Sequence, residues 1–220
     1  MNNTQKAYLQ LHIAVILFGF TAILGDLISL SAIMLVWWRV LITSISLLFL
    51  IGFGKKLLLI PRKRIFQYMG IGTLIALHWI CFFGSIKYAN ASVGLVCYAT
   101  TSLFTSFLEP IITKRPFKWY ELSLATIIIP GMIMIVNNID LTMKLGIWIG
   151  LASAFLASLF AILNKKFIND ADAFSITFLE LSSGWLFISL LLPFYFTSEE
   201  NLSFFPNNED WGYLLVLALL

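Results

Sequence analysis

The chain has 220 residues, of which 60% are hydrophobic and only 11% are charged, and its mean hydropathy is +0.93. Soluble domains carry about 25% charged residues, so the composition excludes an ordinary soluble protein and indicates a membrane protein. The net charge of +3 does not indicate a nucleic-acid partner, because all but one of the basic residues lie outside the apolar runs.

Apolar runs long enough to cross a bilayer follow one another along the chain. A membrane-spanning helix needs about 20 mainly apolar residues. We predict that the first run is a retained helix and not a signal peptide, because six more follow it. The seven predicted spans are residues 8–27, 32–52, 65–86, 91–113, 119–137, 145–164 and 173–196.

An eighth apolar run begins at Trp211 and contains only ten residues before the sequence ends. Ten residues are too few to cross the hydrocarbon layer, which needs about 20. We therefore expect the chain to be a fragment of a longer protein, truncated within its eighth helix.

The basic residues lie mostly in alternate loops. If the spans alternate in direction, eleven lysines and arginines fall on one side and two, Lys87 and Lys144, on the other. Cytoplasmic loops carry the excess of basic residues, so we predict a cytoplasmic N-terminus, and the short loops favour a bacterial inner membrane. The eleven are Lys6, Lys55, Lys56, Arg62, Lys63, Arg64, Lys114, Arg115, Lys118, Lys165 and Lys166.

Two spans begin with similar segments, AIMLVWWRV at 32–40 and AFSITFLEL at 173–181. Each places an ionisable residue seven positions after its first alanine, Arg39 in one and Glu180 in the other. If the sixth span repeats the first, the repeat has five helices, and an odd number inserts the second copy upside down, as in many secondary transporters. A chance likeness between two membrane helices is the alternative.

The chain resembles the drug/metabolite transporter superfamily, and within it the EamA family, along essentially its whole length. The resemblance rests on Phe18-Gly19 in the first span, where the family often has Trp-Gly, and on Arg39 in the second. It rests also on the turn KYANASVG at 87–94 and on Gly131 in the fifth span.

The resemblance implies an all-α integral membrane protein with ten helices in two inverted five-helix repeats. The first repeat would be residues 1–138, and residues 139–220 would be an incomplete second repeat. The chain departs from the family after the fourth span, where Lys114-Arg115-Pro116 replaces a common acidic–basic pair.

Four of the ionisable residues within the predicted spans lie away from the span ends and are weighed for function: Arg39, His78, Glu109 and Glu180. Each costs at least about 2.5–3.5 kcal/mol at the bilayer centre, so each is a candidate for function. At about 1.5 Å per residue, Arg39 and His78 lie at one depth in the outer half, and the two glutamates lie in the inner half. We predict two polar layers and no direct bridge between Arg39 and Glu180.

Each of these four residues also has a structural interpretation. Arg39 could bond to helix-end carbonyls with its stem on an apolar surface, and His78 could be a neutral hydrogen-bond partner between helices. Glu109 could pair with a basic residue of the loop that follows it. Glu180 is harder to explain in this way, because no basic residue is close to it on its own span.

The fourth span carries polar residues at steps of three and four, which place them on one helix face. Such a stripe lines a contact between helices or a watery cavity. The stripe consists of Tyr98, Thr101, Ser102, Thr105 and Glu109.

We predict a secondary transporter that moves a small metabolite by alternating access, with its substrate near the membrane midplane. Arg39 would attract an anionic group, and the aromatic residues would pack against the substrate. Burial favours the neutral form of an ionisable group, so a buried acid or histidine could carry a coupling proton. The predicted substrate-binding residues are Arg39, Trp38, His78, Trp79, Tyr98 and Thr101, and the proton-coupling candidates are Glu180, Glu109 and His78.

By resemblance, the substrates would be amino acids or similar metabolites, often exported. We expect no cofactor, metal or catalytic residue, and a homodimer is left open. A membrane-embedded enzyme is the less favoured alternative, because the sequence contains no HExxH, CxxC or dense acidic motif. A non-transporting membrane protein or gene remnant is a further alternative.

Overall fold

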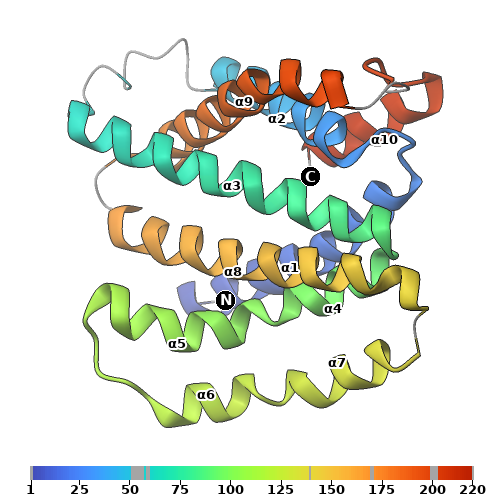
Figure 1. Cartoon of the computed structure of the whole chain (residues 1–220). Coiled ribbons are helices and arrows are strands. Elements are labelled where there is room, and N and C mark those ends of the chain that lie inside the picture. Colours follow the sequence, from blue (N-terminus) through green and yellow to red (C-terminus); the bar gives the residue numbers. More distant parts are fainter. Residues whose placement is uncertain are drawn as a thin grey trace.

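The computed structural model is a bundle of helices that run side by side in alternating directions (Figure 1). The structure describes residues 2–50, 57, 60–138, 140–168, 171–198 and 203–219. Within this part, seven segments are long and apolar enough to cross a membrane, which confirms the predicted all-helical membrane fold. They are Thr4–Leu27, Ala32–Leu50, Arg62–Tyr88, Ala91–Thr113, Trp119–Val136, Leu141–Phe167 and Ala173–Thr197.

The helices follow the predicted spans closely, and four of them begin at the predicted residues, Ala32, Ala91, Trp119 and Ala173. Their bounds are α1 (Asn3–Leu27), α2 (Ala32–Leu50), α3 (Arg62–Tyr88), α4 (Ala91–Ala99), α5 (Thr101–Thr113), α6 (Trp119–Ala125), α7 (Ile128–Val136), η2 (Leu141–Met143), α8 (Lys144–Phe167), α9 (Ala173–Ser198) and α10 (Asn208–Leu219).

Two helices begin earlier than their apolar runs because polar side chains cap their first turns. The Asn2 side chain accepts a hydrogen bond from the Gln5 backbone at 2.8 Å, and the Gln5 side chain accepts one from the Asn2 backbone at 3.1 Å. In α10, the Asn207 side chain accepts from the Asp210 backbone at 2.7 Å. Such caps satisfy N–H groups that have no partner within the helix.

The fourth and fifth spans are each divided into two helices, which hydropathy did not predict. Between α4 and α5, the backbone N–H and the hydroxyl of Thr100 both donate to the Cys97 carbonyl, the hydroxyl at 2.6 Å. Between α6 and α7 the interruption precedes Pro130. A proline has no N–H to donate and is tolerated in the first turn of a helix, so a new helix beginning just before it is the favoured arrangement.

The centre of the bundle is α3, which packs against α8 on one side and α9 on another (Figure 1). Small residues permit the close approach of α3 to α9, as is common between membrane helices. A Cβ atom on Gly72 would overlap the carbonyl oxygen of Glu180, and one on Gly184 would lie 2.9 Å from the carbonyl oxygen of Gly72. In contrast, α6 and α7 form an outer layer at the edge of the bundle.

The connection 114–118 and the end of α8 lie at one end of the bundle, and the α3–α4 and α7–α8 connections lie at the opposite end (Figure 1). The basic residues of 114–118 and of the end of α8 therefore gather at the same end. This is the arrangement on which the topology prediction depends.

Candidate functional site

A small cavity of about 80 Å³ lies between α1, α2, α3 and α4. Its wall is mainly aromatic, and among the described residues that line it Arg39 is the charged one and none is acidic. The lining residues are Phe18, Thr21, Arg39, His78, Trp79, Phe82, Leu95 and Tyr98.

The guanidinium of Arg39 lies against aromatic rings. Its Cζ atom is 4.4 Å from the ring centroid of Trp79 and 5.7 Å from that of Phe83, which are cation–π distances. The Nη1 atom is buried and has no hydrogen-bond partner within the described part of the chain. A buried cation normally has an acidic or hydrogen-bonded partner, so Arg39 has donor capacity left for a bound group.

His78 is buried and joins α3 to α8. Its Nδ1 lies 2.9 Å from the Ser153 carbonyl oxygen and 2.8 Å from the Ser153 hydroxyl. A carbonyl oxygen only accepts, so this network assigns the hydrogen to Nδ1. The Ser153 hydroxyl in turn donates to the His78 carbonyl at 3.1 Å. The imidazole also packs beside the ring of Tyr98, at 5.6 Å between centroids. Arg39 and His78 therefore share one cavity, as their equal depth predicted.

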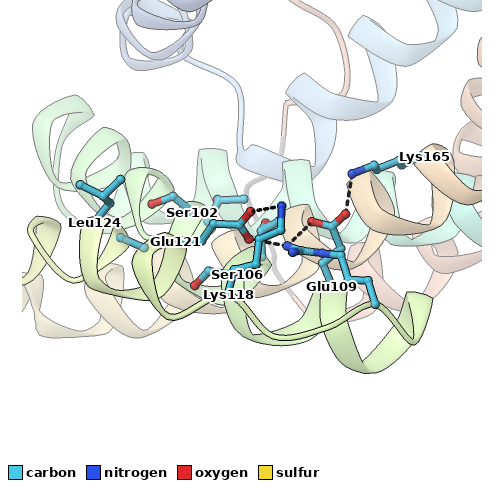
Figure 2. A pocket seen from close by; sticks show the side chains of 11 residues that line it. Ser102, Ser106, Glu109, Lys118, Glu121, Leu124 and Lys165 are labelled. Carbon is cyan, nitrogen blue, oxygen red and sulfur yellow. Dashed lines mark hydrogen bonds and ion pairs between the residues drawn. The ribbon is translucent and has the colours of Figure 1, made fainter.

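A second cavity, of about 670 Å³, lies at the end of the bundle that carries the 114–118 connection (Figure 2). Hydroxyl and charged side chains make up most of its wall. The lining residues are Thr101, Ser102, Thr105, Ser106, Glu109, Arg115, Lys118, Glu121, Leu124, Ala125 and Lys165.

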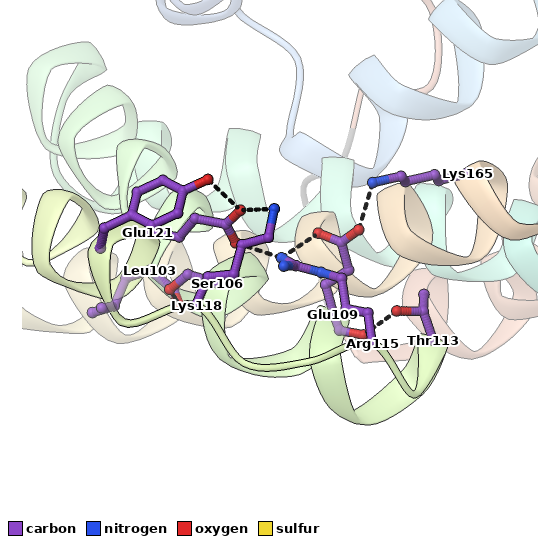
Figure 3. Close-up of polar contacts among 9 residues, drawn as sticks. Leu103, Ser106, Glu109, Thr113, Arg115, Lys118, Glu121 and Lys165 are labelled. Carbon is purple, nitrogen blue, oxygen red and sulfur yellow. Dashed lines mark hydrogen bonds and ion pairs between the residues drawn. The ribbon is translucent and has the colours of Figure 1, made fainter.

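The charged residues of this second cavity form a continuous network (Figure 3). Glu109 of α5 pairs with Lys165 of α8 at 2.5 Å and with Arg115 at 3.1 Å. Arg115 also pairs with Glu121 of α6 at 2.5 Å, and Lys118 lies 3.5 Å from Glu121. The hydrogen bond to Glu121, and then that to Glu109, raises the pKa of Arg115 above its usual value. The network ties together α5, α6 and α8 at this end.

Glu180 lies on α9 and is buried. One of its carboxyl oxygens accepts a hydrogen bond from the Asn164 side chain of α8 at 3.3 Å. The other is buried without a partner within the described residues. Glu180 and Glu109 do not share a site, because Glu109 bonds Lys165 while Glu180 bonds Asn164, the preceding residue of α8. The predicted inner layer therefore consists of two separate carboxyl groups, which bond to different faces of α8 from α5 and α9.

Comparison with known proteins identifies the family. A sequence model of the EamA-like transporter family matches residues 5–137, which is more than half of the chain. The chain belongs to this family. No curated protein matches the sequence. No solved structure matches it either.

The EamA match includes every residue that lines the small cavity. It also includes Glu109, Arg115, Lys118 and Glu121 of the charged network, but not Lys165. Membership in this transporter family and the seven apolar segments of the described residues together make the chain an integral, multi-pass membrane protein.

Two of the residues predicted to bind substrate lie elsewhere in this EamA chain. The indole N–H of Trp38 donates to the Phe204 carbonyl at 2.8 Å, and its ring packs beside Trp211 at 5.0 Å between centroids. Trp38 is next to Arg39 on α2, and neighbouring helix residues point about 100° apart. The two side chains therefore face different parts of the bundle. Thr101 lies beyond the interruption at Thr100 and lines the larger cavity.

Sequence reasoning missed several polar contacts between distant segments. Asp210, buried at the start of α10, accepts hydrogen bonds from the backbone and hydroxyl of Ser29 at 2.8 and 2.6 Å. Lys87 donates to the backbone carbonyl of Ile28. Ser153 and Asn164 hold His78 and Glu180, respectively. Among these, Asn164 had the clearest signal, as a polar residue inside an apolar helix.

Proposed function

We propose that this chain acts in secondary transport of a small anionic metabolite by alternating access. The observation that carries the proposal is Arg39, a buried guanidinium that lines a cavity without an acidic partner among the described residues. Family membership supports transport over the enzyme alternative.

In this proposal the substrate carboxylate occupies the donor positions that Arg39 leaves unused. Charge-assisted hydrogen bonds from a guanidinium to a carboxylate are frequently bidentate and fix the orientation of the bound group. The Trp79 ring holds the guanidinium from one side. Tyr98 and Phe82 would pack against the substrate body and exclude water from the ion pair, which strengthens it.

Alternating access requires the helices of the two proposed five-helix units to move relative to each other. The contacts that join the first unit to α8 include His78 with Ser153, and Glu109 with Lys165. We assign the second contact to closing the bundle at the 114–118 end, because its network joins three helices there (Figure 3). The Lys165 side chain is 69% exposed, so water can replace this ion pair when the helices separate.

Glu180 is our candidate for the group that carries a coupling proton. Its hydrogen-bond partner is the neutral amide of Asn164, and it forms no ion pair within the described residues, whereas Glu109 pairs with two cations. Buried carboxyl groups of this kind occur as proton carriers in membrane transporters. We therefore assign coupling to Glu180 and closure to Glu109.

We further propose that the N-terminus is cytoplasmic and that the membrane is a bacterial inner membrane. The support is that Lys114, Arg115, Lys118 and Lys165 lie at one end of the bundle and line two neighbouring cavities there. Basic residues are concentrated on the cytoplasmic side of membrane proteins. The larger cavity would then face the cytoplasm.

The test is counterflow in liposomes that contain the purified protein and a panel of unlabelled amino acids and carboxylates. The expected result is saturable uptake of a labelled anionic panel member, reduced tenfold or more, by an order-of-magnitude estimate, in Arg39→Ala. Lys144→Ala is the matched control, because this lysine is exposed on α8. Equal uptake by Arg39→Ala and the control would contradict the assignment of Arg39.

Coupling is tested in the same liposomes with an imposed pH gradient. Glu180→Gln is expected to retain exchange between the two faces of the membrane but to lose the response to the gradient. An unchanged response in Glu180→Gln would overturn the assignment of coupling to this residue. If the unmodified protein shows saturable exchange that does not respond to the pH gradient, transport is supported and proton coupling is not.

A further inference from the structure

We propose that the Arg39 cavity selects small 2-hydroxy-monocarboxylates, such as glycolate and lactate. This inference rests on the proposed transport function and names the chemical class of its substrate. It follows from the size of the cavity, from the balance of charge in its wall, and from one unused hydrogen-bond acceptor.

The size of the cavity limits the substrate to a few atoms. A cavity needs about 10–15 Å³ to hold one water molecule, and this one measures about 80 Å³. It therefore accepts a solute of about five to eight non-hydrogen atoms. Two-carbon and three-carbon acids meet this limit. Acids with an aromatic ring do not fit the cavity in this conformation.

The charge of the wall favours one negative group and no positive group. Among the described residues of the wall, Arg39 is the charged one and none is an aspartate or a glutamate. An amino acid would bring an ammonium group that has no acidic partner here and that Arg39 repels. A dicarboxylate would bring a second carboxylate without a cation. Both leave a buried charge unpaired, which is costly.

The remaining feature is an acceptor on His78. Its Nδ1 carries the hydrogen that it donates to the Ser153 carbonyl, so Nε2 of the neutral ring is an acceptor. No hydrogen bond to Nε2 is present among the described residues, and the ring lines the cavity beside Arg39 and Tyr98. A hydroxyl group next to the substrate carboxylate would donate to this nitrogen.

The experiment compares three acids of nearly equal size in proteoliposome counterflow: lactate, alanine and propionate. Lactate and alanine have the same number of non-hydrogen atoms and differ in a hydroxyl against an ammonium group. We expect lactate to exchange more than about tenfold faster than alanine at equal subsaturating concentration, and about three- to tenfold faster than propionate. Malonate, a dianion, should not compete with lactate.

A variant locates the origin of the preference for the hydroxyl group. His78→Phe keeps a ring in the wall and removes the acceptor, so the ratio of the lactate rate to the propionate rate is expected to fall to about one. His78 also holds α8, so this variant could fail to fold. The three-acid series in the unmodified protein decides the proposal without it.

The outcomes separate this inference from the function on which it rests. If alanine exchanges as fast as lactate, and both depend on Arg39, transport stands and the hydroxy-acid assignment is overturned. Equal rates for propionate and lactate would show that the His78 acceptor does not contribute, and they would also overturn the hydroxy-acid assignment. If no member of the wider amino-acid and carboxylate panel exchanges, the proposed function itself fails.

Discussion

The small cavity and the charged network contain similar residue types but use them differently. In the cavity, Arg39 lies against aromatic rings and no acidic side chain faces it among the described lining residues. In the network, Glu109 and Glu121 pair with the basic residues around them. A charge that has a partner holds helices together, whereas a buried charge without one is available to a ligand. The state of pairing, more than the presence of charge, distinguishes the proposed binding site from the ion-pair network.

The largest effect is expected from Arg39→Met, which keeps the apolar stem and removes the charge. Binding of the transported anion should weaken by about 10- to 150-fold, the worth of a hydrogen bond to a charged group. The thermal stability of the protein in detergent should not fall, because the variant removes a buried charge that lacks an acidic partner. A large loss of stability would mean that Arg39 is a structural residue. The contrast between the small cavity and the charged network would then be wrong.

The small cavity also requires that α3, which supplies part of its wall, is held in place by its close contact with α9. Gly72→Ala should lower the free energy of unfolding by about 1–3 kcal/mol, because the new methyl group meets the backbone of α9. Gly70→Ala is the matched control on the same helix, since nothing lies within 4 Å of its Cβ position. Denaturation in mixed detergent measures both variants. Equal stabilities would show that α3 and α9 are not in close contact.

A smaller effect is expected from Ser153→Ala. The variant removes a buried hydroxyl and its hydrogen bond to the His78 carbonyl, which should cost about 0.5–1.5 kcal/mol of stability. The backbone carbonyl that accepts from His78 remains. The ratio of lactate to propionate exchange should therefore be unchanged. A changed ratio would show that the hydroxyl, and not the backbone, orients the imidazole.

The smallest effect concerns the ion pair between Glu109 and Lys165. A double-mutant cycle with Glu109→Gln and Lys165→Gln should give a coupling energy of about 0.2–1 kcal/mol, because the Lys165 side chain is 69% exposed. The coupling should decrease in high salt, which screens exposed charges. A coupling of several kcal/mol that ignores salt would make this pair a buried structural bridge rather than an opening contact.

Hydropathy and helix geometry predicted the spans and the shared level of Arg39 and His78, because both depend only on position along a helix. They did not predict how each side chain is turned about its helix axis. Trp38 was expected in the cavity with Arg39, but it faces Trp211 and the Phe204 carbonyl. That contact depends on a segment more than 160 residues away in the sequence, which no local pattern contains.

The second difference between prediction and structure arises from partners on other helices. Glu109 and Glu180 were placed in one layer by depth alone. In the structure they bond successive residues of α8, Lys165 and Asn164, which point to different faces of that helix. Depth was a useful guide for Arg39 and His78 because their helices are neighbours, and it was not enough for two carboxyl groups separated by a third helix.

The interruption of the fourth span at Thr100 has a consequence for the water that accompanies a moving solute. Tyr98, just before it, belongs to an aromatic wall, and Thr101, just after it, belongs to a wall of hydroxyl and charged groups. A solute that travels along this span would lose its hydration shell on one side of Thr100 and recover it on the other. In the proposed transport function, Thr100 would mark the level at which the solute exchanges its hydration shell within a single membrane crossing.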